Sequence, residues 1–514
     1  MKLFKLANPL LWGFSIALSW TWGLGLFFSV QMGIQFGIPG LVAFAVPNAI
    51  GLFAFGAMTA WIARHHEAGS AFERHFLFTV GKLRWVFLLY QVLAIALSFF
   101  AIFKYVFVPM GVHIGVMALL LLGAGVLLGE QFNIRTIKWS HLGMAAVIAL
   151  SIALIGWGGQ NYFNQTAKDL TTLNVHGFES AASLKFVGFF VPILVGFLLG
   201  PWLDIQQWQR AIQIHREGTN IGAAYFFGAT IFFFILLFHG TLGVTIWSEA
   251  GRLGVSESLT YLNTGIFHAK SAVVEFLFNI EGTDATMLFK FMYVVFLCLC
   301  IIATVDSGYV ALKWFQADAT KKSDSVLLSL IPQGLLTSPL PPFVLAAVVG
   351  LAGVFMDFEL EYYMAFYGSF LVGYALVFLF RTSFAPRFAA FTQTTLVSLA
   401  ALSLGIFGLG YFEELWYLMA IGAIVPLVHA IVCIATRKAV EEIKRSGVIE
   451  RLAEGEIGKA VQERFRPDGP PSPRPDAAEE DAAIPSTTAS SAVVRPVDVE
   501  SRADLSPAVA AIGG

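Results

Sequence analysis

The stretch Ser19-Trp20-Thr21-Trp22-Gly23-Leu24-Gly25 places two glycines near the middle of an apolar segment. A helix in lipid satisfies its backbone groups internally, so glycines at this depth indicate either close packing against a neighbouring helix or a break that forms a site. A second apolar segment contains Pro192, Gly196 and the pair Gly200-Pro201. The matched placement of the two disruptions favours a pair of broken helices around one site.

The composition excludes a soluble protein. Of the 514 residues, 57% are hydrophobic and only 13% are charged, whereas a soluble protein carries about 25% charged residues. Aromatic residues make up 14% of the chain, which favours a lipid-facing helix bundle over an outer-membrane barrel. No basic surface points to a nucleic-acid partner. Because no acid, base and nucleophile converge within the apolar segments, we do not expect an enzyme.

Twelve apolar segments approach the length of about 20 residues that a membrane span needs. They lie near 9–36, 38–63, 85–108, 112–129, 139–158, 184–203, 220–247, 286–316, 339–357, 360–380, 389–411 and 415–436. The first and sixth segments are five apart, so the first five and the next five cross the membrane in opposite directions. The sequence predicts an all-α membrane protein with a five-plus-five inverted repeat and two extra C-terminal helices.

The predicted organisation along the chain follows from these segments. Residues 1–8 form a short cytoplasmic N-terminus, and a transmembrane domain spans 9–437, with repeat one at about 9–158, repeat two at about 184–411 and an extra helix at about 415–436. Residues 438–466 alternate charged and apolar side chains, which predicts a cytoplasmic amphipathic helix. Residues 467–514 hold eight acids, three arginines and no aromatic residue, which predicts a disordered acidic tail able to recruit a cytoplasmic partner.

Lys and Arg side chains are concentrated in alternate connections between the predicted spans. With a cytoplasmic N-terminus, the inner connections include Arg64, Arg84, Lys138, Arg210 and Arg216, whereas the outer ones hold only Lys168, Lys185, Arg252 and Lys270. Lys104 lies at an outer turn, where we expect its amine to snorkel to water. This bias predicts an integral protein of the cytoplasmic (inner or plasma) membrane, with both termini in the cytoplasm and lipid around its spans.

The eighth segment contains Ala303-Thr304-Val305-Asp306-Ser307, which sets a carboxylate and two hydroxyls in an apolar helix. These groups are costly in a membrane unless they face a cavity, an ion or each other. In one interpretation the hydroxyls of Thr304 and Ser307 form hydrogen bonds with the preceding helical turn, and Asp306 either caps a helix or pairs with another polar group. In the other, hydroxyl and carbonyl oxygens supply the hard ligands of a cation site.

Three motifs resemble the sodium:solute symporter family. The run PWLDIQQWQRAIQIHR at Pro201–Arg216 is similar to the segment after that family's sixth core helix. Gly37-Ile38-Pro39-Gly40-Leu41 resembles the junction of its first two core helices, and Ala303–Ser307 resembles the S-T-x-D-S run of its eighth. The three occur in the family's order, and the resemblance covers roughly residues 9–440. It implies the leucine-transporter-type fold, with solute held at the broken first and sixth helices.

The resemblance also implies roles for individual residues. The solute would contact positions at the two breaks and on the third helix: Trp20, Trp22, Gly25, Gln91, Pro192 and Gly196. A sodium ion would lie between the first and eighth helices, against Cys300, Ala303 and Thr304 on the eighth and carbonyls within Trp22–Val30, with Trp22, Gly23, Phe27 and Val30 as the candidates. Gating positions would be Asp204, Arg210, Asp306 and Ser307.

Two positions depart from the family's pattern and bear on the coupling ion. Position 303 is Ala, so one of the family's two hydroxyls is missing, and His141 stands where the family usually has an Asp near the sodium site. Losing a hard oxygen ligand and a negative charge weakens sodium binding, whereas histidine titrates near neutral pH and can carry a proton. The coupling ion is therefore Na⁺ or H⁺, and no cofactor or other metal is expected.

Two functions agree with these features. The first is a cation-coupled symporter that moves a small polar solute by alternating access around a site near the middle of the membrane. The alternative is a non-transporting sensor or scaffold that keeps the transporter fold, motivated by Ala303, His141 and the acidic tail. Deletion of 467–514 separates them, because transport survives that deletion and a signalling output does not.

Overall fold

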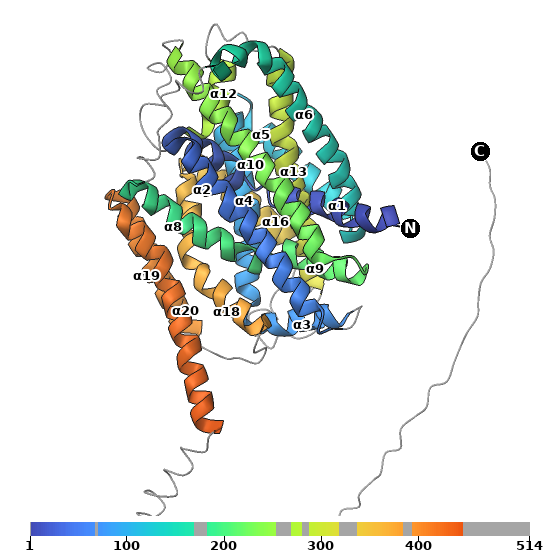
Figure 1. The fold of residues 1–514 in the computed structure, drawn as a ribbon, viewed down its shortest axis with the longest axis vertical. Helices are drawn as coiled ribbons and strands as arrows, with labels where there is room; N and C mark the ends of the chain where they lie inside the picture. The colour runs from blue at the N-terminus through green and yellow to red at the C-terminus, as the bar shows by residue number, and fades with distance from the viewer. Residues whose placement is uncertain are drawn as a thin grey trace, which may run out of the picture. The chain divides into compact units, whose positions relative to one another are not determined.

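The computed structural model describes residues 2–66, 70–168, 182–252, 269–279, 287–317, 337–383 and 393–445. These residues are almost entirely helical, with no strand among them (Figure 1). The chain divides into two compact units, Met1–Ile443 and Lys444–Gly514, and the fold given below is that of the first. Most of the predicted amphipathic helix and all of the acidic tail lie outside the described residues.

The first half of the chain contains the following elements, in order: α1 Lys2–Ser19, α2 Gly23–Ala63, α3 Ala71–Val80, the 3-10 turn η1 Gly81–Leu83, α4 Arg84–Ile102, the π-helical turn η2 Phe103–Phe107, α5 Ile114–Gln131 and α6 Ile134–Lys168. Helix α2 contains two helices joined at a kink, because Gly37 adopts a φ of 65° inside it. That positive φ is strained for any residue with a Cβ, which explains a glycine at this junction.

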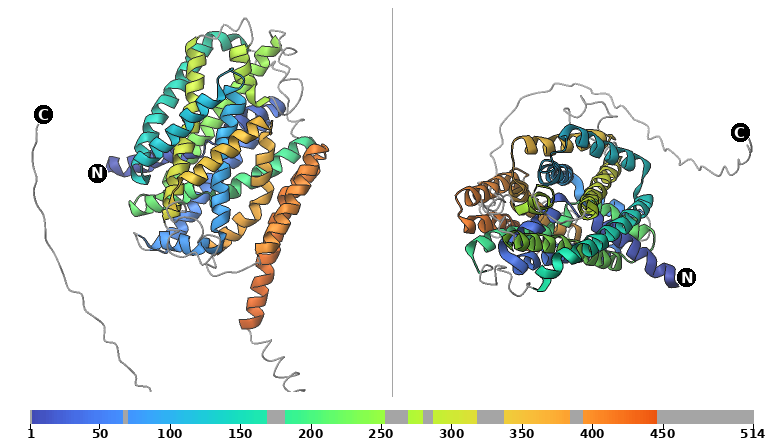
Figure 2. Two further views of the ribbon diagram at one scale, coloured as in Figure 1. Left: turned by 180° about the vertical axis from the view of Figure 1, so that it is seen from behind. Right: turned by 90° about the horizontal axis from the view of Figure 1, so that it is seen from above.

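The second half begins with α8 Leu184–Leu199, the 3-10 turn η3 Gly200–Trp202, α9 Ile205–Arg216 and α10 Ile221–Arg252. It continues with η4 Ala269–Ser271, α12 Ala272–Asn279, α13 Met287–Ala317, α16 Leu340–Phe355, α17 Leu360–Ala365, the π-helical turn η6 Phe366–Phe370, α18 Val372–Ser383, α19 Gln393–Phe412 and α20 Trp416–Arg445. Many of these helices run roughly parallel and are seen nearly end-on from above in Figure 2.

Helix occurs at each of the twelve predicted apolar segments, and most ends agree within a few residues. Among the described residues, eight helices are long and apolar enough to cross a membrane, or nine if the bent pair of Leu360–Phe370 and Val372–Ser383 is one span. Leu340–Phe355 and Val397–Phe412 are shorter apolar helices. The chain is therefore an integral membrane protein by length and composition of its helices, and the count of twelve spans stays a prediction.

The break in the sixth segment falls at Gly200-Pro201, the last of the disruptions noted in the sequence. Pro192 and Gly196 are inside α8, and the helix is interrupted only from Gly200 to Asp204. Asp204 then caps α9, because its Oδ1 accepts a hydrogen bond from the backbone N–H of Gln206 at 2.8 Å. The sequence places Arg210 in a cytoplasmic connection. In the structure it belongs to α9 and its side chain is fully buried rather than exposed in a loop.

Close backbone contacts hold the part of α2 that follows the Gly37 kink against α8. Helix α2 packs along α10 and also crosses α8. At Gly51 the crossing is so tight that a Cβ would lie 2.1 Å from the carbonyl oxygen of Phe197. Only glycine fits such a contact without moving one of the two backbones. Gly51 has ordinary helical backbone angles, so the close contact, and not the backbone conformation, explains the glycine at this position.

Candidate functional site

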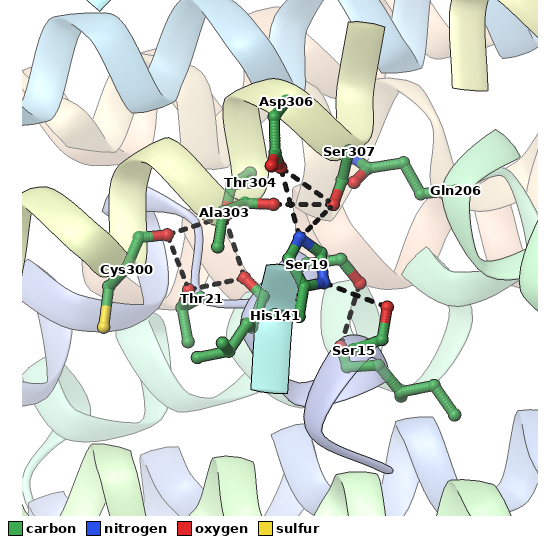
Figure 3. Close-up of polar contacts among 12 residues, drawn as sticks. Ser15, Ser19, Thr21, His141, Gln206, Cys300, Ala303, Thr304, Asp306 and Ser307 are labelled. Atoms are coloured by element: carbon green, nitrogen blue, oxygen red, sulfur yellow. Dashed lines mark hydrogen bonds and ion pairs between the residues drawn. The ribbon is translucent and has the colours of Figure 1, made fainter. Parts of the chain in front are cut away.

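The break between α1 and α2 brings four oxygen atoms together. The hydroxyl of Thr21 lies 2.7 Å from the carbonyl oxygen of Leu18 and 3.0 Å from that of Cys300. The hydroxyl of Thr304 lies 3.2 Å and 3.3 Å from the same two carbonyl oxygens (Figure 3). We call these four atoms the oxygen ring. The Leu18 carbonyl belongs to the last turn of α1, which ends at Ser19, and it also accepts a hydrogen bond from the backbone N–H of Thr21 at 3.3 Å.

The oxygen ring satisfies itself in this structure. Each threonine hydroxyl has one proton to donate, so two donors serve the two carbonyl oxygens. Hydroxyl and carbonyl oxygens are the ligand type that Na⁺ takes, but none of the four carries a formal charge. The ring is therefore a neutral cluster that a cation enters only by displacing its hydrogen bonds.

A second polar cluster lies around His141, from α6. The His141 Nδ1 atom is 2.9 Å from the Ser15 hydroxyl of α1, and Nε2 is 3.2 Å from Oδ1 of Asp306 on α13. The Ser307 hydroxyl is 3.4 Å from Nε2 and also donates to the carbonyl of Ala303 at 2.6 Å (Figure 3). Three helices thus surround one buried imidazole.

Arg210 completes this cluster from α9. Its Nε donates to the Ser15 hydroxyl at 3.1 Å, one terminal nitrogen donates to the Ser307 hydroxyl at 2.8 Å, and the other donates to the carbonyl of Gln206 at 3.1 Å. We call Ser15, His141, Arg210, Asp306 and Ser307 the histidine network. All five side chains are fully buried. With a neutral imidazole, the charges of Arg210 and Asp306 cancel, and a proton on His141 raises the total to +1.

Several polar atoms near the network have no hydrogen-bond partner among the described residues. They are Oδ2 of Asp306, Oδ2 of Asp204 and both side-chain polar atoms of Gln206 and of Gln91. Buried polar groups are nearly always hydrogen-bonded, so a cluster of unsatisfied ones marks a place where water, an ion or a solute binds. These atoms come from α4, from α9 and the Asp204 residue that caps it, and from α13.

A small cavity adjoins the break of the first helix. Its lining is apolar and aromatic, without a charged side chain: Trp22, Leu24, Tyr90, Pro192, Ile193, Gly196, Phe197, Met364, Tyr367 and Gly368. The ring centroids of Trp22 lie 5.5 Å from Tyr90 and 5.4 Å from Tyr367, and those of the two tyrosines are 4.9 Å apart. Helices α4 and α8, the π-helical turn η6 and the first break therefore enclose one aromatic space.

The structure brings some of the residues expected at a solute site together and separates others. Trp22, Pro192 and Gly196 line the cavity, and Trp20 packs against Trp22 with ring centroids 4.5 Å apart. Gln91 lies beside Gly308 rather than in the lining. Gly25 faces Phe232 of α10, so its expected contact with a solute has no support in this geometry.

The expected first-helix cation ligands pack against other helices, and the role of their carbonyls as ligands stays a prediction. Gly23 packs against Ala101 of α4 and Val30 against Gly243 of α10. The Phe27 ring contacts Tyr105 and His239. The helix is interrupted at residues 20–22, so α13 is met by the last turn of α1 and by Thr21. Leu18 and Thr21, which sequence reasoning missed, supply the first-helix oxygens that lie within hydrogen-bond distance of Cys300 and Thr304.

Sequence reasoning also missed an ion-pair cluster at the end of the bundle where α12 lies. Lys270 of η4 lies 2.9 Å from Glu361 Oε1, and both side chains are fully buried. The same carboxylate oxygen accepts from Gln31 of α2 at 3.0 Å. Lys104, which we expect to snorkel, pairs with Glu359 at 2.9 Å and with the exposed Asp357 at 3.0 Å. The sequence did contain a sign of this cluster. Glu359 and Glu361 flank the first residue of α17, and Lys104 and Lys270 lie in the connections predicted to face the same, outer side.

The opposite end of the bundle, where α3 lies, carries its own polar contacts. Glu217, between α9 and α10, accepts from Lys138 at 2.7 Å and from the Trp12 indole at 2.9 Å. Burial raises the pKa of this carboxyl, but hydrogen bonds from Lys138, Trp12, Gln213 and Asn8 outweigh that effect, and the net pKa lies below the usual value. Ion pairs therefore join helices of both halves at both ends of the bundle.

No protein-family model matches the chain, and no curated protein matches it. Solved structures do match: a Na⁺-coupled sialic acid symporter, in a substrate-bound outward-open state, aligns with a TM-score of 0.50 over 82% of this chain and 88% of that chain. The sequences are 12% identical, so this likeness shows the fold alone. The chain has a transporter-type fold, which confirms that part of the prediction, and its membership of the symporter family stays a prediction.

Proposed function

We propose that the chain is a secondary active transporter that couples the movement of a small polar solute to an inward flow of protons. The observation that carries the proposal is the buried contact of His141 with Asp306, beside Arg210 and at the point where the two broken helices meet α13. A titratable group buried among charged partners inside a membrane is a functional site by default. The fold shared with a Na⁺-coupled symporter supports a cation-coupled transporter.

The proposed architecture has twelve spans in two inverted five-helix repeats, followed by two extra helices. It is supported by the two breaks, at residues 20–22 and 200–204, which occupy the first span of each repeat. Each repeat also contains a π-helical turn, η2 in the first and η6 in the second. The bias of Lys and Arg supports an arrangement in which the α3 end faces the cytoplasm and the α12 end faces outwards.

Two observations favour the proton over sodium as the coupling ion. First, the oxygen ring has no charged ligand and is closed by its own hydrogen bonds. Second, the carboxylate of Asp306 already faces His141, and the cationic guanidinium of Arg210 donates to Ser307 beside it. A metal cation entering this network meets a fixed positive charge, whereas a proton needs only a free imidazole nitrogen.

The charge of the histidine network links proton binding to movement. The empty network is neutral, and the protonated network carries one positive charge. Burying an extra charge in a low-dielectric interior costs several kcal/mol, to order of magnitude. The protonated carrier therefore favours states in which the network contacts water or in which a bound solute offsets the charge. Solute binding in the aromatic cavity and proton binding on His141 then become coupled steps of alternating access.

Uptake by purified protein in liposomes tests the proposal. With an inward proton gradient in sodium-free buffer, we expect a member of a broad solute panel to accumulate, and a protonophore to abolish the accumulation. The variant Asp306→Asn provides the matched control, because it keeps the size of the side chain and removes its charge. The same assay is repeated with an inward sodium gradient. Accumulation that strictly requires sodium contradicts proton coupling, and a lack of accumulation under both the proton and the sodium gradient contradicts transport.

A further inference from the structure

The hydroxyl of Ser15 links α1 to the buried imidazole of His141. It lies 2.9 Å from Nδ1 of His141 (Figure 3) and 3.1 Å from Nε of Arg210. All three side chains are fully buried. Because a hydroxyl has one proton and two acceptor lone pairs, the direction of each hydrogen bond follows from counting protons. That direction decides which nitrogen of His141 is free to bind a further proton.

The Nε2 atom of His141 carries the ring proton when the imidazole is neutral. It lies 3.2 Å from Oδ1 of Asp306, and a carboxylate only accepts hydrogen bonds. The hydroxyl of Ser307 does not supply a proton instead, because it donates to the Ala303 carbonyl at 2.6 Å and accepts from Arg210 at 2.8 Å. Nε2–H therefore donates to Asp306, and Nδ1 keeps an unprotonated lone pair.

The same count makes Ser15 the donor to Nδ1. The guanidinium of Arg210 only donates, so Ser15 accepts from its Nε and keeps its own proton for another partner. Among the described residues, His141 is the one other group for which the structure gives a hydrogen bond with this hydroxyl. By contrast, Ser19, one turn later in α1, donates to the carbonyl of Ile16 at 2.9 Å. The Ser15 proton therefore serves a neighbouring helix, α6, in place of its own backbone.

Binding of a proton at Nδ1 reverses this hydrogen bond. The imidazolium has two N–H donors, so Nδ1–H points at the Ser15 oxygen, which then accepts from both His141 and Arg210. The imidazole gains a proton from water, and Ser15 keeps its own, which turns to a third acceptor. Serine in a helix uses the carbonyl four residues earlier, here that of Leu11, and such a bond bends and slightly destabilises the helix.

We propose that Ser15 is a positioning residue that transmits proton binding on His141 to α1, by changing from a hydrogen-bond donor to an acceptor. The inference deepens the transporter function proposed above and rests on it for its meaning in transport. Helix α1 ends at Ser19, directly before the first break, and it packs against α13. A bend in its last turns therefore alters the helix end that forms one side of the break.

The charged and titratable groups that face this contact come from three other helices. Asp306 faces Nε2 from α13, and Arg210 faces Ser15 from α9. Tyr225 of α10 and Asp204, at the start of α9, act electrostatically on the same guanidinium. These groups lie on α9, α10 and α13, so the hydroxyl of Ser15 is the part of the contact that changes on α1.

Nitrogen NMR tests the proton positions without transport. The full-length protein in detergent carries ¹⁵N-labelled histidine, and His141→Gln identifies the signals of this ring among the ten histidines. At alkaline pH, where histidine is ordinarily neutral, we expect a protonated Nε2 and an unprotonated Nδ1 that accepts a hydrogen bond. The Nδ1 signal should move in Ser15→Ala and move less in Ser15→Thr, which keeps the hydroxyl. A neutral ring with its proton on Nδ1 overturns the inference, as does an Nδ1 signal unchanged in Ser15→Ala.

Hydrogen exchange in the same samples tests the transmission to α1. After correction for the intrinsic effect of pH, amide exchange in α1 should rise on acidification in the wild type, because the helix is bent and weakened. The rise should be absent in Ser15→Ala and in His141→Gln. Ser98→Ala is the matched control, because Ser98 is equally buried but donates to the Ala94 carbonyl of its own helix at 3.0 Å. A rise in Ser15→Ala equal to that of the wild type overturns the inference.

Uptake in liposomes separates this inference from the function on which it rests. Ser15→Ala should move the pH profile of initial uptake towards acidic pH by about half a unit or more, because a charged donor loses more than a neutral acceptor when its partner is removed. Ser15→Thr should move the profile less, and Ser98→Ala should leave it unchanged. Proton-driven uptake with an unmoved profile in Ser15→Ala overturns the inference. If the NMR and exchange results hold but no proton gradient drives uptake, the role of Ser15 stands and the transport function fails.

Discussion

Arg210 donates a hydrogen bond of 2.8 Å to the hydroxyl of Ser307, joining the polar helix that follows the second break to the helix that carries Asp306. The guanidinium holds three acceptors at once, on α1, α9 and α13. Its fork of five N–H donors makes this possible, and a lysine ammonium on a flexible stem does not reproduce it. The contact therefore sets both the geometry and the charge around His141.

Replacing Arg210 with Gln is expected to shift the pH profile of uptake towards alkaline pH by about one unit or more. Removing the fixed positive charge leaves Asp306 facing His141 alone, so the proton is held more tightly and released less easily. The profile of initial uptake rate against pH measures the shift. Arg210→Lys keeps the charge and should move the profile less. A shift towards acidic pH in Arg210→Gln contradicts the assigned role.

Replacing Asp306 with Asn is expected to reduce gradient-driven accumulation about a hundredfold or more while leaving solute exchange measurable. The amide cannot stabilise a protonated imidazole, whereas exchange needs only the solute-loaded movement. Accumulation under a proton gradient and exchange of labelled for unlabelled solute are measured in the same liposomes. Equal losses of both activities indicate a folding defect and count against the proton role.

Replacing Glu361 with Gln is expected to destabilise the protein by about 3–5 kcal/mol, because it leaves the buried amine of Lys270 without its closest charged partner. Thermal unfolding in detergent measures the loss. The matched control is Lys313→Met, which breaks a pair whose side chains are 41% and 50% exposed and should cost less than about 1 kcal/mol. Similar losses in the two variants contradict the difference in burial.

The contact of Glu217 with Lys138 predicts a stability that depends on pH. Because the pKa of Glu217 lies below its usual value in the folded protein, its contribution is complete above the unfolded value and is lost as pH falls through the folded one. Glu217→Gln should therefore cost about 1.5–3 kcal/mol at neutral pH and progressively less below about pH 4.5. Thermal unfolding over this pH range tests it, and a cost that grows towards acid contradicts it.

Gly51→Ala is expected to destabilise the protein by about 1–3 kcal/mol, because the added Cβ would lie 2.1 Å from the carbonyl oxygen of Phe197. Gly123→Ala is the matched control. A Cβ at Gly123 meets no atom within 4 Å, and alanine favours helix, so that variant should be neutral or slightly more stable. Comparable unfolding temperatures for the two variants refute the tight crossing.

The helices could be predicted from the sequence because each is an apolar run bounded by charged or polar residues. Those boundaries agree within a few residues at α10, α13 and α16. Helix α9 was missed as a buried element because it is rich in glutamine and ends in basic residues, which is the signal of a cytoplasmic loop. Its burial depends on tertiary partners that a hydropathy pattern does not contain.

The site could be predicted in part. Thr304, Asp306 and Ser307 were found because polar groups in an apolar helix are costly, and His141 because it departs from the pattern of a resembling family. The exact position of the break in the first helix could not be predicted, because glycines mark a break only approximately. The helix is interrupted at residues 20–22, just before Gly23. The aromatic cavity was only partly visible in the sequence, since Tyr90 and Tyr367, which both line it, lie 277 positions apart in the chain.

The charge arithmetic of the histidine network has an electrical consequence. If the empty carrier returns with a neutral network and the loaded carrier moves with one positive charge, only the loaded step responds to voltage. A membrane potential, negative inside, then supplies about 2.3 kcal/mol per 100 mV for each charge that crosses the full field. Uptake by this protein should therefore produce an inward current, even where no pH difference exists across the membrane.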